Sequence, residues 1–416
     1  MNQEVEVRFG KSVKRFKVVE DPIPHILVPT TKEVVHGWFY GYEDGGRREC
    51  SSERILINPY NGCSVNCPEC YSRGYKGYFD LWNEKGIIAV FKDIDVKLKR
   101  ELSQLYVAST GYLCPVTDPF QQPLEGKYHL SERVAGVFLD LDLPIEFITK
   151  CGGNIPTRLI KRMAEHRYGH CLAQFSILSV DEEFRKVFSP GGSTVEEQFK
   201  AVRKCADLGL YTVVRMDPIM PGITDNPKEI EQVVERAKIE GAKHMIFSVC
   251  DLGDAWRDRL LKVIKEHYPH AYPLWLKIYT ERVGNSFSAD ISYRKKIFAL
   301  ARKICEKYGL TMSLCMEFEI VRKNGRIWYK GLNEEFMTSK VCEGLITPIY
   351  YRKSLKENFR PFEKCDGDCL SCAKGLKTPV CGSPILSKAP ALRLNDYKKL
   401  RLTPSEDLTK WASQHT

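Results

Sequence analysis

Apolar residues along this chain gather in short runs that alternate with stretches of helical periodicity. Six runs are dense in Ile, Val, Phe and Tyr, as expected for strands buried on both faces, and cover residues 54–60, 104–109, 145–149, 172–178, 211–216 and 244–249. Strands that alternate with helices in this way form parallel sheets with right-handed crossovers. The pattern therefore predicts an α/β fold.

The helices between these runs carry start and stop signals. Thr194 and Glu197 form a capping box ahead of an apolar helical face. Asn226 and Pro227 open the next helix, and Gly241 ends it. Six such units close naturally into a partial (β/α)6 TIM-like barrel, whose chemistry lies at the carboxyl ends of the strands.

Three parts are expected along the chain. Residues 1–50 form a small N-terminal extension that is partly β, and residues 51–320 form the barrel core. Residues 321–416 are loop-rich and contain many cysteines, with a hairpin expected at Asn324 and Gly325.

Composition places the chain among ordinary globular proteins, with 43% apolar and 28% charged residues. No apolar run approaches the roughly 20 residues that cross a bilayer, and the N-terminus lacks the apolar segment of a signal peptide. We therefore expect a cytoplasmic protein that does not contact membranes.

The formal charge is +10, and much of the excess lies near the C-terminus. From Arg322 onward, 18 Lys and Arg residues face 10 Asp and Glu residues. A basic region of this kind suits a polyanion such as nucleic acid, although an ordinary solvated surface would look the same.

The 16 cysteines divide into scattered and grouped sets. In a reducing cytoplasm disulfides are rare, so the scattered set is interpreted as small buried apolar residues. That set comprises Cys50, Cys114, Cys151, Cys171, Cys205, Cys250, Cys305 and Cys315.

One group follows the first predicted strand, in the loop NPYNGCSVNCPECY at residues 58–71. Cys63, Cys67 and Cys70 have the spacing C-x3-C-x2-C, so three thiolates can hold three irons of a [4Fe–4S] cluster and leave the fourth iron open. S-adenosylmethionine can chelate that open iron through its amino and carboxylate groups. Structural zinc would need a fourth ligand, and the loop contains no other Cys or His.

A second group lies in the C-terminal region. Cys365, Cys369, Cys372 and Cys381 fall within a polar stretch of the chain, with Cys342 upstream as an alternative to Cys381. Such a group predicts a second, fully ligated [4Fe–4S] cluster or, as the second choice, a structural zinc ion.

Several motifs together resemble the radical S-adenosylmethionine superfamily, and in particular its branch that contains spore photoproduct lyase. Beyond the three-cysteine loop, they are VTDPFQQPLE (116–125), FITK (147–150), QFSILS (174–179) and VVRMDPIMPGITD (213–225). The resemblance covers about residues 50–250 and implies a partial barrel with a [4Fe–4S] cluster and S-adenosylmethionine as cofactors.

The resemblance also implies roles for single residues. Thr117 matches a small hydroxyl near the methionine moiety, and Lys150 and Ser176 match residues that bind its carboxylate. Arg215 and Asp217 end the fifth strand, where contacts to ribose or substrate occur, although an ion pair lining the barrel is equally compatible.

The sequence departs from the family at the cluster loop. Glu69 stands where most members have an aromatic residue, while Tyr71 matches one of the tyrosines that flank the third cysteine in spore photoproduct lyase. Pro115 occupies the position of the lyase's hydrogen donor, and the neighbouring Cys114 is either a radical-quenching thiol or a buried core residue. Repair of the spore thymine dimer is therefore not the expected reaction.

These features predict a radical enzyme charged by a flavodoxin- or ferredoxin-type electron donor. The expected substrate is a nucleobase, a nucleoside or nucleic acid, with lyase-like cleavage of a C–C or C–N bond. The alternatives are a peptide- or protein-modifying radical enzyme with an auxiliary cluster, and a non-catalytic iron–sulfur or zinc protein that binds nucleic acid.

Overall fold

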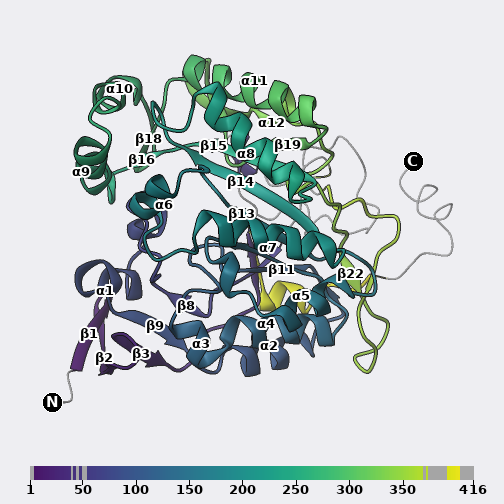
Figure 1. The fold of residues 1–416 in the computed structure, drawn as a ribbon. Helices are drawn as coiled ribbons and strands as arrows, with labels where there is room; N and C mark the ends of the chain where they lie inside the picture. Colours follow the sequence, from purple (N-terminus) through teal and green to yellow (C-terminus); the bar gives the residue numbers. More distant parts are fainter. Residues whose placement is uncertain are drawn as a thin grey trace.

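A curved, mostly parallel sheet forms the centre of the structure, a computed structural model that describes residues 4–38, 41–43, 46–48, 54–368, 372 and 391–402. Among these residues the largest sheet has nine strands, in the order β19-β15-β14-β13-β12-β11-β7-β4-β24 (Figure 1). The first seven in this order are parallel: β19 (Thr311–Leu314), β15 (His244–Val249), β14 (Tyr211–Ile219), β13 (Leu172–Ser176), β12 (Ile145–Thr149), β11 (Thr110–Leu113) and β7 (Arg54–Ile57).

Helices cover the outer face of this sheet and connect its strands. They include α4 (Leu130–Asp140), α5 (Thr157–Ala164), α7 (Val195–Asp207), α8 (Pro227–Ile239) and α11 (Ile291–Tyr308). The predicted α/β partial barrel is confirmed, and β19 extends it by one parallel strand beyond the six expected.

Five predicted strands coincide with strands of this sheet, but the second was placed wrongly. The sheet contains β11 (Thr110–Leu113), whereas the predicted run ends in β10 (Val107–Ala108), which pairs antiparallel with β22 (Tyr350–Tyr351). Gly111 explains the error, because glycine weakens a strand signal in sequence. Here a Cβ at residue 111 would come within 2.7 Å of the Phe138 ring, so the glycine allows α4 to pack closely.

Helix boundaries follow the signals in the sequence. Thr194 and Glu197 form the capping box of α7, and the Asn226 side chain accepts a hydrogen bond from the Glu229 backbone at the start of α8. The apolar faces of both helices are buried against the sheet, as with Phe199 and Val233.

The N-terminal segment forms a second sheet, in the order β1-β2-β3-β9-β8. Its strands are β1 (Glu4–Phe9), β2 (Ser12–Val19), β3 (His25–Val28), β9 (Ile88–Phe91) and β8 (Tyr60–Asn61), and α1 (Tyr78–Lys85) packs on it. Strands from residues 4–28 thus pair with residues 88–91 of the predicted core, although the domain boundary at residue 50 itself stays a prediction.

Two smaller groups of elements complete the part of the chain described. A lobe in the upper left of Figure 1 contains α9 (Arg257–His267), α10 (Tyr272–Ile278) and the short strands β16 (Leu252–Gly253), β17 (Glu281–Val283) and β18 (Ser286–Ser288).

The predicted hairpin at Asn324 and Gly325 is confirmed as β20 (Phe318–Lys323) and β21 (Arg326–Gly331). Near the C-terminus, β24 (Ala391–Arg393) pairs antiparallel with β4 (His36–Trp38) at the sheet edge.

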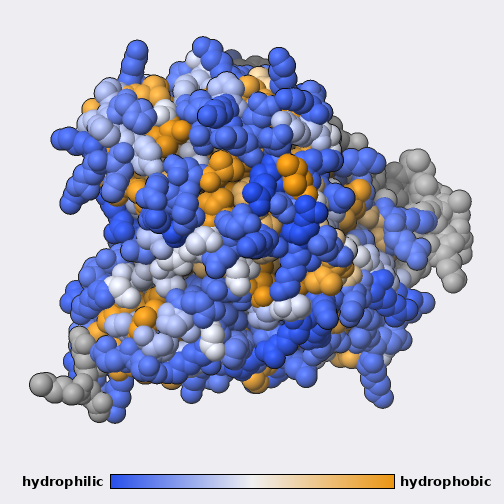
Figure 2. Space-filling view, in the orientation of Figure 1, coloured by the Kyte–Doolittle hydropathy of each residue, from blue (hydrophilic) through white to orange (hydrophobic). Residues whose placement is uncertain are grey.

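The surface matches a globular protein. Figure 2 shows a largely hydrophilic face on which apolar side chains appear in small, separate groups. Among the described residues, every helix is too short or too polar to span a bilayer.

Candidate active site

The carboxyl ends of the parallel strands bring the predicted site residues to one edge of the sheet. The three-cysteine loop follows β7, Thr117 follows β11, and Lys150 directly follows β12. Ser176 ends β13 and pairs in register with Arg215 of β14. Residues far apart in sequence therefore surround the mouth of the barrel.

The cysteine loop presents three thiols to each other. Cys63 and Cys67 are buried and Cys70 is partly buried. Burial is the main cause that raises the pKa of each thiol, and for Cys63 and Cys67 the charge of a neighbouring cysteine raises it further. Without a metal these thiols therefore stay protonated, and a bound metal would stabilise the thiolate form.

Contacts from both sides hold this loop in place. Arg73 donates from Nε and Nη2 to the Cys67 carbonyl, and its guanidinium lies 4.3 Å from the centre of the Trp82 ring. On the other side, the Gly191 backbone donates to the Val65 carbonyl at 3.1 Å. A side chain at residue 191 would overlap the Ser64 carbonyl oxygen.

The donor set fits an iron–sulfur cluster. Within the described ranges, no three His, Cys, Asp or Glu side chains are arranged to hold one metal ion. A cubane makes a different demand, because each thiolate binds a different iron and the sulfurs need not meet around a single ion. Three soft, buried thiols on one constrained loop are the ligands that such a cluster requires.

Lys150 lies beside this loop. Its Nζ donates to Ser189 Oγ at 3.1 Å and to Glu69 Oε1 at 3.4 Å, and with Ser176 it lines a cavity of about 20 Å³. Burial alone would lower the Lys150 pKa, but the negative charges of Cys67 and Glu69 outweigh it and raise the value. An ammonium group beside a hydroxyl can bind a carboxylate.

Two residues of this arrangement were missed in the sequence. Asp118 is buried and accepts from the Lys150 backbone at 2.6 Å and from Thr149 Oγ1 at 2.9 Å, so it positions the start of the Lys150 segment. Ser189 touches both Lys150 Nζ and, at 3.9 Å, Cys67 Sγ. Asp118 lies inside the VTDPFQQPLE motif, whereas Ser189 carries no sequence signal because its loop meets Lys150 only in three dimensions.

Glu69 takes part in the site although its position is usually aromatic in the family. Its side chain is 5% exposed and pairs through Oε1 with Lys150. The second oxygen, Oε2, is buried and has no hydrogen-bond partner among the residues that the structure describes. A buried carboxylate oxygen without a donor is unfavourable, so a ligand group is expected to approach it.

Arg215 and Asp217 form the ion pair that the sequence allowed. Arg215 Nε donates to Asp217 Oδ2 at 3.2 Å and Nη1 to Gln174 Oε1 at 2.7 Å, while Gln174 Nε2 donates to Glu146 Oε2 at 3.1 Å. Ser248 donates to the other oxygen of Asp217. This polar track crosses β12, β13, β14 and β15. The sequence held a signal for this track, because Glu146, Gln174 and Arg215 are polar residues inside strands that were predicted to be buried on both faces.

Thr117, Cys114 and Tyr71 surround the loop after β11. Thr117 Oγ1 donates to the Tyr60 carbonyl at 3.5 Å. Cys114 is fully buried and has a backbone φ of 55°. Because the thiol lies inside the protein, burial raises its pKa. Tyr71 is half-exposed and its hydroxyl donates to the Pro115 carbonyl.

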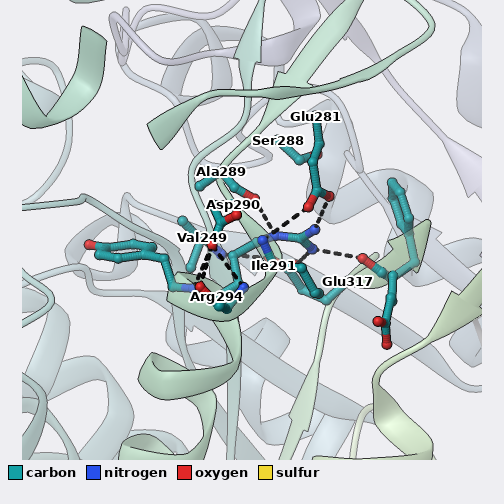
Figure 3. Close-up of polar contacts among 12 residues, drawn as sticks. Val249, Glu281, Ser288, Ala289, Asp290, Ile291, Arg294 and Glu317 are labelled. Atoms are coloured by element: carbon teal, nitrogen blue, oxygen red, sulfur yellow. Dashed lines mark hydrogen bonds and ion pairs between the residues drawn. The ribbon is translucent and has the colours of Figure 1, made fainter. Parts of the chain in front are cut away.

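A second charged network lies next to the mouth, at the end of β15. Arg294 donates to Glu317 Oε2 and Glu281 Oε2, both at 2.8 Å, and to the Ala289 carbonyl at 2.7 Å (Figure 3). Glu317 Oε1 in turn accepts from the Val249 backbone at 2.7 Å.

The C-terminal cysteines are described only in part. Cys342 lies at the amino ends of β15 and β19, where its carbonyl accepts from Ser313 and lies 3.0 Å from His244 Nε2. Cys365 and Cys372 are partly buried, whereas Cys369 and Cys381 lie outside the described residues. The second metal site therefore stays a prediction.

A parallel partial barrel with a three-thiol loop after its first strand defines the class of enzymes that combine an iron–sulfur cluster with S-adenosylmethionine. Residues 57–237 match the Radical SAM superfamily, so this part of the chain is a radical SAM domain. This family uses a [4Fe–4S] cluster and S-adenosylmethionine.

Individual relatives add detail. The chain is 28% identical over 397 residues to the "Radical SAM Nalpha-GlyT isomerase" of Pseudomonas phage M6, covering 92% of this chain and 80% of the relative. It is 25% identical over 262 residues to an uncharacterized protein of Mycobacterium tuberculosis, covering 62% and 75% of the two chains.

Solved structures with a similar arrangement include spore photoproduct lyase complexed with dinucleoside spore photoproduct. That match has 14% identity and a TM-score of 0.46, and covers 70% of this chain and 82% of the other. Streptococcus suis SuiB bound to S-adenosylmethionine matches with 10% identity and a TM-score of 0.42, covering 63% and 49%.

Proposed function

We propose that this enzyme rearranges an amino-acid-substituted nucleobase or nucleoside by radical chemistry at the mouth of its barrel. The observation that carries the proposal is the likeness to an isomerase across 92% of the chain. The site supports it, because a loop suited to an iron–sulfur cluster lies beside the partly buried Lys150 ammonium group, with Ser189 in contact with both.

Each residue of the site has a role in this proposal. Cys63, Cys67 and Cys70 ligate three irons, and Lys150 with Ser176 binds the carboxylate of S-adenosylmethionine. When bound and given one electron by a flavodoxin- or ferredoxin-type donor, the cluster and S-adenosylmethionine supply methionine and a 5′-deoxyadenosyl radical that takes a hydrogen atom from the substrate. Arg215 is buried and paired with Asp217, so it holds a fixed polar group at the wall of the barrel beside the reacting groups.

The name of the phage relative guides the choice of substrate. It describes glycine joined through its α-nitrogen to a unit abbreviated T, and an isomerase that acts on it. With T as thymine, the substrate is a nucleobase, in agreement with the basic C-terminal region. An isomerisation breaks one C–N or C–C bond and forms another in the same molecule, so the product keeps every atom and electron of the substrate. The predicted bond cleavage then becomes one half of a rearrangement.

A direct assay tests this function. The anaerobically reconstituted enzyme, with dithionite and S-adenosylmethionine, is given thymine whose methyl carbon carries glycine through the glycine nitrogen, and in parallel the dipeptide glycyl-threonine. We expect the thymine compound to yield a product of identical mass and different retention by liquid chromatography and mass spectrometry. Conversion of the dipeptide alone would favour the peptide-modifying alternative, and a product of lower mass would indicate a lyase.

A further inference from the structure

Negative charge gathers around Cys250, just after β15. Burial is the first cause that raises the Cys250 pKa, followed by the charges of Glu69, Asp251 and Asp217, while Lys150 opposes them. The three carboxylates come from the cysteine loop, from the segment after β15 and from β14. Glu69 pairs with Lys150 at the end of β12, Asp217 accepts a hydrogen bond from Ser248 of β15, and Asp251 follows β15, so all three carboxylates lie at the carboxyl ends of the parallel strands.

The cations named here are already paired with acids of this group. Lys150 pairs with Glu69, Arg215 with Asp217, and Arg294 is shared between two carboxylates. Glu69, Asp217, Glu281 and Glu317 are thus all paired with Lys150, Arg215 or Arg294, and Arg73 also lies near enough to Glu69 for their charges to interact. Asp251 stands outside these pairs. Figure 3 shows Arg294 between Glu281 and Glu317, with Ser288 close to Glu281.

Asp251 is the acid of this group that makes no ion pair within 4.0 Å among the described residues. Its carboxylate accepts a hydrogen bond from Ser288 Oγ at 2.9 Å. The side chain is exposed to solvent, yet the surrounding protein raises its pKa to about 6. The two observations agree if Asp251 lines an open hollow, which solvent and a ligand can enter while protein atoms surround it on several sides.

Glu69 supplies an independent sign that a ligand enters here. One of its oxygens is buried and lacks a hydrogen-bond donor in the described part of the chain. Its other oxygen depends on Lys150, which we assign to the carboxylate of S-adenosylmethionine. Once that carboxylate binds Lys150, Glu69 loses part of its compensating charge and becomes a stronger acceptor for another cation.

We propose that Glu69 and Asp251 form a subsite for the protonated amino group of the substrate. This inference rests on the proposed function and defines its substrate as a cationic amine. Glycine attached through its nitrogen to a carbon is a secondary amine and carries a positive charge at neutral pH. An ammonium donates hydrogen bonds to carboxylates, so it satisfies the free oxygen of Glu69 and the charge of Asp251 together.

Binding to the full-length, cluster-loaded protein with S-adenosylmethionine tests the subsite. The probes are the glycine-substituted thymine and the same compound acetylated on its amine, which removes the charge and adds one acetyl group. The variants below separate the effect of the charge from that of the added size. We expect the wild type to bind the amine about 10-fold or more tightly than the acetylated form, because a charged hydrogen bond is lost. Asp251→Asn and Glu69→Gln are expected to reduce this preference to about 3-fold or less.

Control measurements keep the result specific. Asp258→Asn removes a carboxylate that is 91% exposed on α9 and is expected to keep the wild-type preference. Iron content and the cluster absorbance are measured for every variant, since Glu69 adjoins Cys70 and Asp251 does not.

Equal binding of both probes, or binding of neither, by the wild type overturns the proposal. So does an unchanged preference in Asp251→Asn. If 5′-deoxyadenosine still forms in that case, the radical function stands and the subsite alone is wrong.

Discussion

At the scale of single residues, the site depends on Lys150 and the groups that hold it. Its backbone is fixed by Asp118, and its ammonium is held between Ser189 and Glu69. Motif resemblance predicted cofactor-binding roles for Lys150 and Ser176, and these roles stay predictions. Glu69 was noticed only as a departure, and Asp251 was missed, because their meeting depends on loops about 180 residues apart in sequence.

Replacing Lys150 tests its assignment to the cofactor carboxylate. Lys150→Met removes the charge and is expected to weaken S-adenosylmethionine binding by about 10-fold to 100-fold, the range of a charge-assisted hydrogen bond. Equilibrium dialysis with cluster-loaded protein measures it, and Lys161→Met on the exposed face of α5 is the control. Wild-type affinity in Lys150→Met would contradict the assignment.

His244 gives a pH dependence of stability at the opposite end of the barrel. It is fully buried between Thr311, Ser313 and the Cys342 carbonyl, and burial lowers its pKa to about 4 from 6.5. The folded state therefore disfavours the proton, so stability is complete above pH 6.5 and falls as the pH drops towards 4. The loss is about 3 kcal/mol at most.

Denaturant unfolding at pH 7 and pH 4.5 measures this effect. His244→Gln has no titrating group, and we expect a smaller difference between the two pH values than in the wild type. The comparison with the wild type cancels the contributions of the other titrating groups. An identical difference in both proteins would show that His244 does not titrate on unfolding in this range.

At the scale of elements, periodicity and caps predicted most of the barrel. The helices α7 and α8 begin at the expected caps, and five strands lie where β-branched and aromatic runs stand. The second strand was missed because Gly111 and the short run TGYL carry little β signal, although packing against Phe138 stabilises them there. Tertiary contacts stabilise this strand, and such contacts cannot be predicted from the periodicity of the sequence.

The loop that contains Gly191 packs closely against the cysteine loop at Ser64, and replacing Gly191 tests whether this contact matters. Gly191→Ala would force the loop at residues 189–192 away from Ser64, which displaces the cysteine loop. We expect iron incorporation to fall to less than about half of the wild-type level, because the three thiols are no longer held together. Gly136→Ala, where the added methyl meets only the end of the Arg162 side chain, is the matched control. Equal iron in both variants would argue against the rigid loop.

At the scale of the whole molecule, we propose that the C-terminal region holds a separate metal site. Cys342 lies at the amino ends of the strands, away from the cysteine loop at the carboxyl ends. With two [4Fe–4S] clusters the protein would contain about eight irons per chain, and Cys369→Ala would retain about four. The retained cluster is expected to respond to S-adenosylmethionine. Loss of all iron in this variant would show that the two cysteine groups serve one site.

The central claim is that Cys63, Cys67 and Cys70 hold a cluster with an open iron that binds S-adenosylmethionine. Electron paramagnetic resonance of the dithionite-reduced protein, with and without S-adenosylmethionine, tests it most directly, with Cys67→Ala and the buried core variant Cys205→Ala compared in parallel. The account predicts a cluster signal that S-adenosylmethionine shifts in the wild type and in Cys205→Ala, and that disappears or no longer shifts in Cys67→Ala. A wild-type signal that S-adenosylmethionine leaves unchanged would contradict it.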